Sequence, residues 1–198
     1  TGTDISIQDK GSGLYWDGAA FVSASQVWLA AAGLEAWSYD ASGIAWVSGT
    51  QYQAVARSVD TALNYSLPYA TATFTFDTSV PTLFVSTPAA DSTLETPSLI
   101  AGTAADSAPN AGVPYVYVTL RRAIDQKWWN FFTGAWGDAA VSTMTAGGAA
   151  WAIAPDNALR GNLWHNATYY VYAAARDGAV PPNQTPEGYY ASTFTVRD

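Results

Sequence analysis

The stretch KWWNFFTGAW (127–136) decides the fold, because the same pattern occurs a second time in the chain. LYWDGAAFV (14–22) has the same order of parts. In each stretch an aromatic pair precedes Asp17 or Asn130, and a glycine-containing turn and a further aromatic residue follow. A motif that recurs within 198 residues indicates repeated architecture before it indicates a binding site.

The second half of the chain consists of short strand-like runs separated by turns. Besides the hairpin, these runs are TLFVSTP (82–88), TPSLIAGTAAD (96–106), YVYVTLRRA (115–123), AAWAIAP (149–155), TYYVYAAAR (168–176) and YYASTFTVRD (189–198). β-Branched and aromatic residues are frequent within the runs, and Gly, Pro, Asn and Asp cluster between them. No segment keeps a 3.6-residue period, so helices should be short or absent. Seven short strands with frequent turns predict an all-β, two-sheet sandwich.

The first half repeats most of these strands in the same order. The corresponding runs are ISIQ (5–8) and VTLR (118–121), AWSYD (36–40) and AWAIA (150–154), YQAVARSVD (52–60) and YYVYAAARD (169–177), and ATFTFD (72–77) and STFTVRD (192–198). The sequence therefore predicts two tandem sandwich domains, residues 1–77 and residues 78–198. Because the first half has no counterpart of residues 82–114, its domain is expected to lack the first two strands.

A sandwich without those strands has an open edge and an uncovered apolar face, which is a liability in water. Two explanations remain open at this point. The native chain extends upstream and the sequence is a cut piece, or strands from another subunit fill the gap. The second explanation would make the chain a subunit of an assembly.

Two segments resemble a known family. FTFDTSVPTLFVSTPAADSTLETPSLIAGTAAD (74–106) resembles the junction between tandem bacterial immunoglobulin-like domains of large surface proteins and adhesins. In those arrays a short Asp-Thr-x-x-Pro linker ends one domain, and a Pro-rich strand and a Gly-Thr-containing strand follow. RRAIDQKWWNFFTGAW (121–136) resembles the hairpin of a subtype that carries a Lys-x-Trp-Asn segment. The resemblance implies immunoglobulin-like domains with a structural, extracellular role, and it identifies no ligand.

Composition argues against several classes of function. A net charge of −8 without a basic stripe argues against nucleic acid as a partner, and no apolar run approaches the ~18–20 residues of a membrane span. The absence of cysteine excludes disulfides and thiolate metal sites. The single histidine, His165, lies before a strand without any nucleophile motif, so we do not expect an enzyme or any catalytic residue.

Calcium is the metal that the sequence favours, because carboxylate, amide and carbonyl oxygens suit a hard cation. In an immunoglobulin-like sandwich the loops after the second and sixth strands lie at the end where the chain enters. Asp106 lies in the first loop, Asp177 and Asn183 lie in the second, and Asp77 begins the arriving linker. These four residues are the predicted calcium ligands. The simpler alternative is that Asp is common in turns, where its side chain bonds to the backbone.

The aromatic residues are open to three interpretations: core, subunit interface or carbohydrate platform. The candidates for an interface or a ligand are Trp16, Trp128, Trp129, Phe132, Trp136, Tyr170 and Tyr172. Trp37 and Trp151 lie in corresponding predicted strands and are expected in the core. Trp128 and Trp129 are neighbours in a strand, so their side chains must point to opposite faces.

Further outward-facing residues belong to the strands around residues 115–123 and 168–176. Tyr170 and Tyr172, or Tyr115 and Tyr117, would form an aromatic outer stripe. Sugar-binding modules use such stripes, but they also need polar groups directed at the hydroxyls. Arg57 and Arg176 are expected at the same position of corresponding strands, where the simplest role is a local ion pair and the alternative is a ligand contact.

The sequence as a whole predicts a structural and adhesive repeat protein at the cell surface or outside the cell. We expect it to assemble into a fibre or sheath through strand complementation and aromatic interfaces. Its partners would be copies of itself or adjacent repeats of a longer chain. The alternative is a carbohydrate- or surface-binding module that recognises surface glycans through exposed Trp and Tyr.

Overall fold

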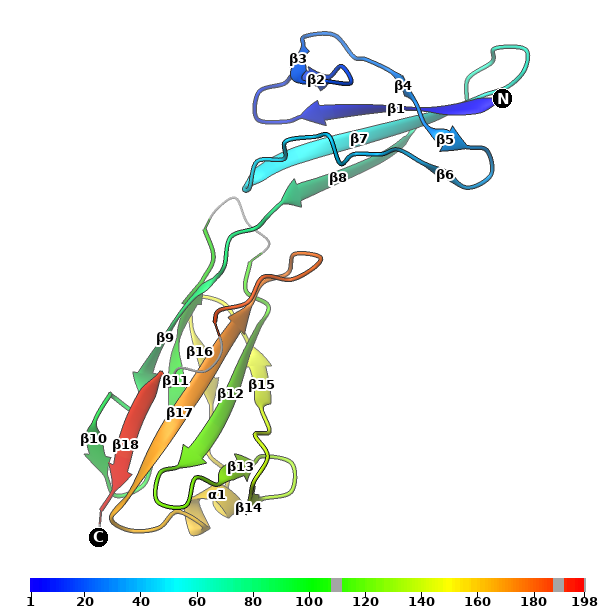
Figure 1. Cartoon of the computed structure of the whole chain (residues 1–198). Helices are drawn as coiled ribbons and strands as arrows, with labels where there is room; N and C mark the ends of the chain where they lie inside the picture. Colours follow the sequence, from blue (N-terminus) through cyan, green and yellow to red (C-terminus); the bar gives the residue numbers. More distant parts are fainter. Residues whose placement is uncertain (108–111, 187–190, 198) are drawn as a thin grey trace. The chain divides into compact units, whose positions relative to one another are not determined.

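The computed structural model describes residues 1–107, 112–186 and 191–197. These residues are almost entirely in strands and loops, with one short helix. They form two compact units: Thr1–Thr78 is the first, and Ser79–Ser107 with the described residues from 112 onward is the second (Figure 1). No described helix is both long and apolar enough to span a membrane.

The first unit contains one main sheet and a small hairpin. Its strands are β1 (Gly2–Asp9), β2 (Tyr15–Trp16), β3 (Phe21–Ser23), β4 (Leu29–Ala30), β5 (Ala32–Gly33), β6 (Trp37–Ser38), β7 (Thr50–Val59) and β8 (Ala70–Phe76). The main sheet has the order β3-β2-β1-β7-β8, and β4 also pairs with β1. β5 and β6 pair only with each other, and β8 forms one edge of the main sheet in the part of the chain that is described.

The second unit contains two larger sheets. Its elements are β9 (Thr82–Thr87), β10 (Ser92–Leu94), β11 (Ile100–Ala105), β12 (Tyr115–Arg122), β13 (Trp128–Asn130), β14 (Ala135–Gly137), β15 (Thr143–Ala146), β16 (Trp151–Ile153), α1 (Asn157–Gly161), β17 (Ala167–Arg176) and β18 (Ser192–Val196). One sheet has the order β10-β18-β17-β12-β13-β14, with β15 also pairing with β12, and the other has the order β16-β11-β9. Part of the predicted strand 189–198 lies outside the described residues, and the rest forms β18.

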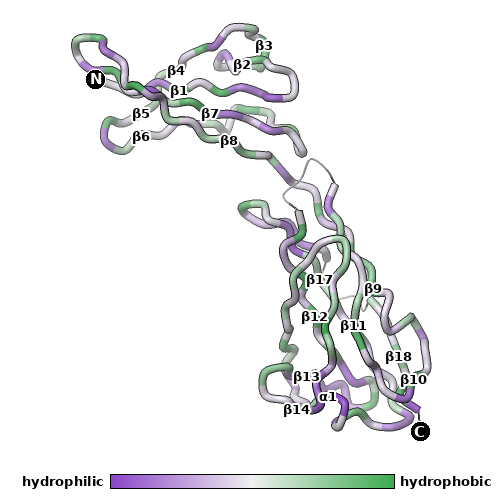
Figure 2. The backbone as a smooth tube through the Cα atoms, turned by 180° about the vertical axis from the view of Figure 1, so that it is seen from behind, coloured by the Kyte–Doolittle hydropathy of each residue, from purple (hydrophilic) through white to green (hydrophobic). Residues whose placement is uncertain are grey.

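Both sheets of the second unit contribute to a single hydrophobic core, which is the arrangement of a β-sandwich. Its fully buried members include Val118 on β12, Val171 on β17 and Ile100 on β11. Figure 2 shows hydrophobic stretches along these strands. Close packing also fixes Gly102, because a Cβ atom there would lie 1.9 Å from the carbonyl oxygen of Phe84. The predicted all-β class and the sandwich architecture agree with this unit.

The central strands of the two units pair in the same register. Ile5 on β1 lies opposite Ala56 on β7, and Val118 on β12 lies opposite Ala173 on β17. The two repeated hairpins also match, because Trp16 pairs with Phe21 and Trp129 pairs with Trp136. The correspondence predicted between these stretches of sequence is therefore present in the strand pairing.

The turns of the two hairpins use the same chemistry. The Oδ1 atom of Asp17 accepts hydrogen bonds from the backbone N–H groups two and three residues further on, and Oδ1 of Asn130 does the same. Both bonds lower the pKa of Asp17, and the bond from Ala20 has the larger effect. Asp and Asn favour turns through this contact, which explains their recurrence in the two motifs.

A tyrosine near the start of each long strand ties the preceding loop to the sheet. The hydroxyl of Tyr52 accepts a hydrogen bond from the backbone N–H of Val47 at 3.0 Å. The hydroxyl of Tyr169 accepts one from the N–H of Trp164 at 2.6 Å. Both bonds reach back five residues, and both tyrosines are buried.

The prediction that Trp37 lies in the core of the first unit is wrong. Trp151 is buried as expected, whereas Trp37 is 41% exposed. Trp37 lies on β6, a two-residue strand that among the described residues pairs only with β5 and so lies outside the main sheet. Trp46 instead packs in a cluster of aromatic rings, with its ring centroid 4.7 Å from that of Tyr52 and further contacts to Phe21, Phe74 and Phe76.

Candidate functional site

The repeated hairpin of the second unit divides its two adjacent tryptophans between core and surface. Trp129 has no exposed surface, and its ring meets Trp136 at 5.2 Å in a T-shaped contact. Trp128 is half-buried on the opposite face, where its ring centroid lies 5.1 Å from that of Tyr172. The alternation predicted for this pair is confirmed. Trp16, the counterpart of Trp129, is likewise buried in its own unit.

The outer face of the larger sheet of the second unit carries a groove of about 560 Å³. β12 contributes Tyr117, Thr119 and Arg121 to its lining, because alternate residues of a strand face the same side. Trp128 from β13 and four residues of β17 also line it. A volume in this range is typical of small-molecule sites, which span about 300–1,000 Å³. We call this feature the outer-face groove.

Each of the two arginines of the outer-face groove lies beside an aromatic ring. The guanidinium carbon of Arg121 is 5.1 Å from the centroid of the Trp128 ring, and that of Arg176 is 5.1 Å from the centroid of Tyr117. Arg121 Nε donates to the carbonyl of Gln126 at 3.3 Å. Arg176 donates to Oε1 of Gln184 through Nε at 3.1 Å and Nη2 at 2.8 Å. These partners hold both side chains along the groove.

The charge of the outer-face groove is positive, although the chain carries a net charge of −8. No carboxylate is among the described residues that line it. Within the described part of the chain, neither Arg121 nor Arg176 forms an ion pair. By contrast, Arg57, Arg122 and Arg197 each pair with an acidic side chain. The two groove arginines therefore offer cationic charge that no described carboxylate neutralises.

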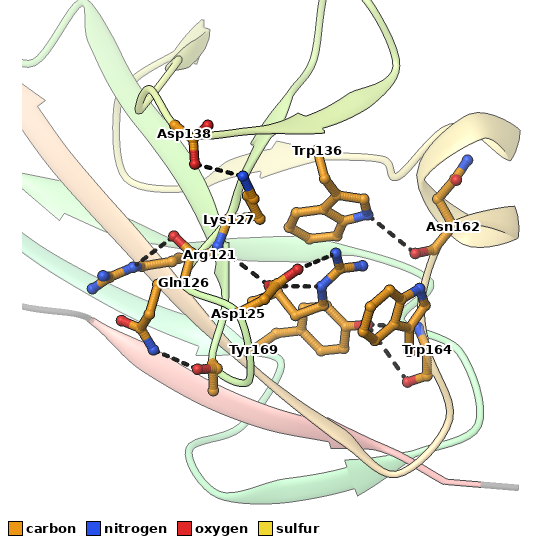
Figure 3. Close-up of polar contacts among 11 residues, drawn as sticks. Arg121, Asp125, Gln126, Lys127, Trp136, Asp138, Asn162, Trp164 and Tyr169 are labelled. Atoms are coloured by element: carbon orange, nitrogen blue, oxygen red, sulfur yellow. Dashed lines mark hydrogen bonds and ion pairs between the residues drawn. The ribbon is translucent and has the colours of Figure 1, made fainter.

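A second cluster of polar and aromatic side chains surrounds the buried Arg122 at the end of β12. Its guanidinium lies 3.6 Å from the ring centroid of Trp164 and 4.4 Å from that of Trp136. Two hydrogen bonds, of 3.0 and 2.6 Å, join it to the carboxylate of Asp125. Figure 3 shows Asp125, the two tryptophans and Tyr169 gathered in this cluster. The contact with Arg122 lowers the pKa of Asp125.

We infer a structural role for this arginine cluster, because its ion pair, ring contacts and hydrogen bonds join its members to one another and to nearby loops, although Nη1 of Arg122 has no hydrogen-bond partner among the described residues. Trp136 Nε1 donates to the carbonyl of Asn162 at 3.1 Å, which ties the hairpin to the end of α1. Burial raises the pKa of Tyr169, although its hydrogen bond with Trp164 opposes the effect. The cluster therefore anchors the repeated hairpin to the body of the second unit.

Two of the four predicted calcium ligands come together in the second unit, and a third contacts one of them. A carboxylate oxygen of Asp106 and one of Asp177 lie within 4.8 Å of each other. Asp177 Oδ1 accepts from the backbone N–H groups of Ala179 and Asn183, and its Oδ2 accepts from Nδ2 of Asn183. These bonds organise the loop after β17 in the way expected of a turn aspartate. Calcium binding at this end of the second unit stays a prediction.

Asp77, the fourth predicted ligand, belongs to the first unit. It is buried there, and the hydroxyl of Ser48 contacts its Oδ1 at 3.5 Å. Ser48 Oγ also accepts from the backbone N–H of Thr78. The expected role of Asp77 in a calcium site stays a prediction as well.

The remaining predicted residues fall at separate places. Phe132 is 78% exposed at the tip of the hairpin, and Trp136 lies in the arginine cluster. Tyr170 lies on β17 and is half-buried, but it is not among the residues that line the groove. His165 is exposed, with Nδ1 2.9 Å from the carbonyl of Arg197.

The expectation that Arg57 and Arg176 share one strand position is wrong. Arg57 lies opposite Asp4 and pairs with it at 2.9 Å, whereas Arg176 lies opposite Tyr115. In the common register Arg57 matches Ala174, two residues before Arg176. The two arginines therefore differ in strand position and in surroundings: Arg57 forms an ion pair with Asp4, and Arg176 lines the groove. The sequence analysis does not name Arg121 or Thr119 as site residues. Both lie an even number of residues from Tyr117 on β12, so strand alternation places all three on the same face of the sheet.

Comparison with known proteins does not assign the chain to a family. No protein-family model matches the chain, and a search of curated proteins finds no match.

Proposed function

We propose that the chain is a structural and adhesive repeat protein of the cell surface, built from tandem immunoglobulin-like domains. We further propose that its first domain is completed by a strand from another copy. The observation that carries the proposal is the contrast between two equivalent phenylalanines, Phe74 and Phe194. The repeated hairpins and the matching strand registers support a tandem array.

The immunoglobulin-like assignment is supported by the tyrosines that close the loops before β7 and β17. In that fold, a tyrosine near the start of the sixth strand hydrogen-bonds to the backbone a few residues upstream. Tyr52 and Tyr169 each do so across five residues. A tyrosine corner in both units, at matching positions, favours two copies of one fold over two unrelated sheets.

Phe74 and Phe194 occupy the same place in the last strand of each unit. Phe74 lies opposite Tyr52, and Phe194 lies opposite Tyr169. Phe194 is 1% exposed, whereas Phe74 is 40% exposed. In the second unit β10 pairs in parallel with β18, placing Ser92 opposite Phe194. Within the described residues of the first unit, no strand takes the corresponding place beside β8.

The exposed edge at β8 is the proposed acceptor for the donated strand. Unpaired backbone groups on such an edge bind an extended segment through main-chain hydrogen bonds. The donor, a segment of another copy, would run parallel to β8 as β10 runs beside β18. Donor and acceptor are different surfaces, so the contact is head-to-tail, and it builds an open fibre when the rotation between copies does not close a ring.

The assembly state of the purified chain tests this proposal. Light scattering and negative-stain electron microscopy should show regular fibres that grow with protein concentration. A synthetic peptide of residues 82–105, which contains the strands that cover the second unit, should bind the first unit and block growth. A scrambled peptide of the same composition is the control. A monodisperse monomer at every concentration, with no binding of the peptide, would contradict the proposal.

A further inference from the structure

We propose that the outer-face groove of the second unit binds an acidic oligosaccharide built from uronate sugars. This function goes beyond the proposed assembly and does not depend on it. Every described residue that lines the groove belongs to the second unit. Assembly through β8 and binding in the groove therefore succeed or fail separately.

The aromatic rings of the outer-face groove supply surfaces for sugar rings. Trp128 and Tyr172 form one aromatic pair, and Tyr117 adds a third ring. All three side chains are half-buried, so packing restrains them while part of each ring borders the groove. Ring faces carry partial negative charge, which attracts the weakly positive C–H groups on one face of a pyranose.

The arginines select an acid. Arg121 and Arg176 have no carboxylate partner among the described residues, and a guanidinium binds a carboxylate through two parallel hydrogen bonds. Each arginine lies 5.1 Å from an aromatic ring centroid. A carboxylate attached directly to a sugar ring fits this spacing, because the ring can contact the aromatic side chain while the carboxylate meets the guanidinium.

The separation of the two arginine–aromatic pairs indicates more than one sugar. Arg121 lies near one end of β12, and Arg176 lies opposite Tyr115 at the other end. The guanidinium of Arg176 reaches the ring of Tyr117, so the two pairs are centred on positions 117 and 121 of β12, about 13 Å apart at ~3.3 Å per residue. A single sugar ring is shorter than this distance. An oligomer with a carboxylate on each ring would reach both arginines at once.

The hydroxyl-bearing residues between the two pairs favour a sugar over an acidic peptide. Thr119 and Ser142 line the groove and offer hydroxyl groups that can donate or accept. A glutamate side chain carries its carboxylate on a flexible chain and has no apolar ring for the aromatic residues. A peptide would therefore pair with the arginines of the groove but would not contact its aromatic rings.

Isothermal titration calorimetry on the full chain tests the proposal with tetragalacturonate as the probe. Cellotetraose serves as a neutral sugar and tetraglutamate as an acidic peptide. We expect binding of tetragalacturonate that weakens as salt is raised, and at least tenfold weaker binding of the other two. Arg176→Gln and Trp128→Ala should each weaken tetragalacturonate binding at least tenfold.

Arg160→Gln is the matched control, because Arg160 is exposed in the last turn of α1 and does not line the groove. It removes the same charge and should leave the affinity within about twofold. If Arg176→Gln unfolds the unit, Arg121→Gln provides the same test on the other arginine.

Three results would overturn the proposal. The first is absence of tetragalacturonate binding to the unaltered chain. The second is equal or tighter binding of cellotetraose or tetraglutamate, which would assign the groove to neutral glycans or to acidic peptides. The third is an equal loss of affinity in Arg176→Gln and Arg160→Gln, which would show that only net charge matters.

Discussion

At the scale of single residues, the second unit depends on side chains that join a loop to the sheet. The hydroxyl of Tyr169 accepts the backbone N–H of Trp164, and Arg122 lies between two indole rings beside the same tyrosine. A buried N–H group that loses its acceptor is costly. Stability should therefore be sensitive to changes that remove one polar atom and leave the packing intact.

Tyr169→Phe tests the loop closure. The substitution leaves the N–H of Trp164, a partly exposed residue, without its acceptor and should lower the free energy of unfolding by about 0.5–1.5 kcal/mol. Tyr115→Phe is the control, because Tyr115 is largely exposed and its loss should change little. Urea unfolding measures both. Equal effects from the two substitutions would show that the hydrogen bond contributes nothing specific.

The same tyrosine predicts a limit at high pH. Burial raises the pKa of Tyr169 in the folded state, so folding disfavours its phenolate. Its contribution to stability is complete below the ordinary tyrosine pKa of about 10 and is lost as pH rises through the folded value. Unfolding between pH 8 and 11 should show a decline in stability that is smaller in Tyr169→Phe. An identical decline would assign the effect to other groups.

Asp125→Asn tests the charge of the arginine cluster. It leaves the buried guanidinium of Arg122 without its counter-ion and should cost about 1–2 kcal/mol at pH 7, since Asp125 is partly exposed. Asp138→Asn breaks the more exposed pair with Lys127 and should cost less than about 0.5 kcal/mol. Urea unfolding of both variants gives the comparison, and equal losses would contradict the special role of Arg122.

Acid should remove the difference between Asp125→Asn and the unaltered protein. The pKa of Asp125 is lowered by Arg122. The stability that the carboxylate contributes is therefore present above the ordinary pKa of about 4 and is lost as pH falls through the folded value. The gap in unfolding free energy should narrow progressively below about pH 4. A gap that stays constant would mean that Asn perturbs packing instead of charge.

Sequence reasoning at this scale succeeds where strand alternation decides exposure and fails where the length of a strand decides it. Trp128 and Trp129 divide between surface and core as the alternation requires. The match to Trp151 predicts Trp37 in the core, but among the described residues the two-residue strand β6 pairs only with β5, and Trp37 is partly exposed. Nothing in the local sequence of AWSYD (36–40) determines which strand β6 pairs with.

At the scale of elements, the repeated hairpin is a structural unit with one face turned outward. Its turn is closed by Asp17 or Asn130, and its inner tryptophan lies in the core of its own unit. These features could be predicted because they depend on neighbours in sequence. The outer-face groove could be predicted only in part. Trp128 on β13 and Tyr172 on β17 meet across β12, and only the sheet order brings them together.

Alanine substitution of the adjacent tryptophans separates the two faces of β13. Trp129→Ala removes a fully buried indole and should cost about 3–5 kcal/mol in unfolding free energy. Trp128→Ala should cost less than about 1.5 kcal/mol, because the ring is half-buried and its space opens to the groove. Denaturant unfolding of both variants gives the comparison. A loss in Trp128→Ala as large as in Trp129→Ala would show that both rings serve the fold.

At the scale of the whole molecule, the two units share the pairing of their central strands but differ in the strands that pack against them. β1 and β7 pair in the register of β12 and β17, yet only the second unit has a three-stranded sheet facing that pair within the described residues. The missing counterpart of residues 82–114 could be predicted from the sequence. Whether a strand of another copy completes the first unit, as we propose, could not be predicted, because a single sequence does not give the contacts between chains.

Phe74 and Phe194 provide the test at this scale, because they are the same residue at equivalent positions. Phe194→Ala should lower the free energy of unfolding of the second unit by about 3–5 kcal/mol at any protein concentration. Phe74→Ala should cost the dilute chain only about 1–2 kcal/mol, since much of its ring already faces solvent. At concentrations where the unaltered chain assembles, Phe74→Ala should prevent growth in light scattering. If Phe74→Ala destabilises the dilute chain as strongly as Phe194→Ala, the face around Phe74 is already covered within one molecule, and no donated strand is needed.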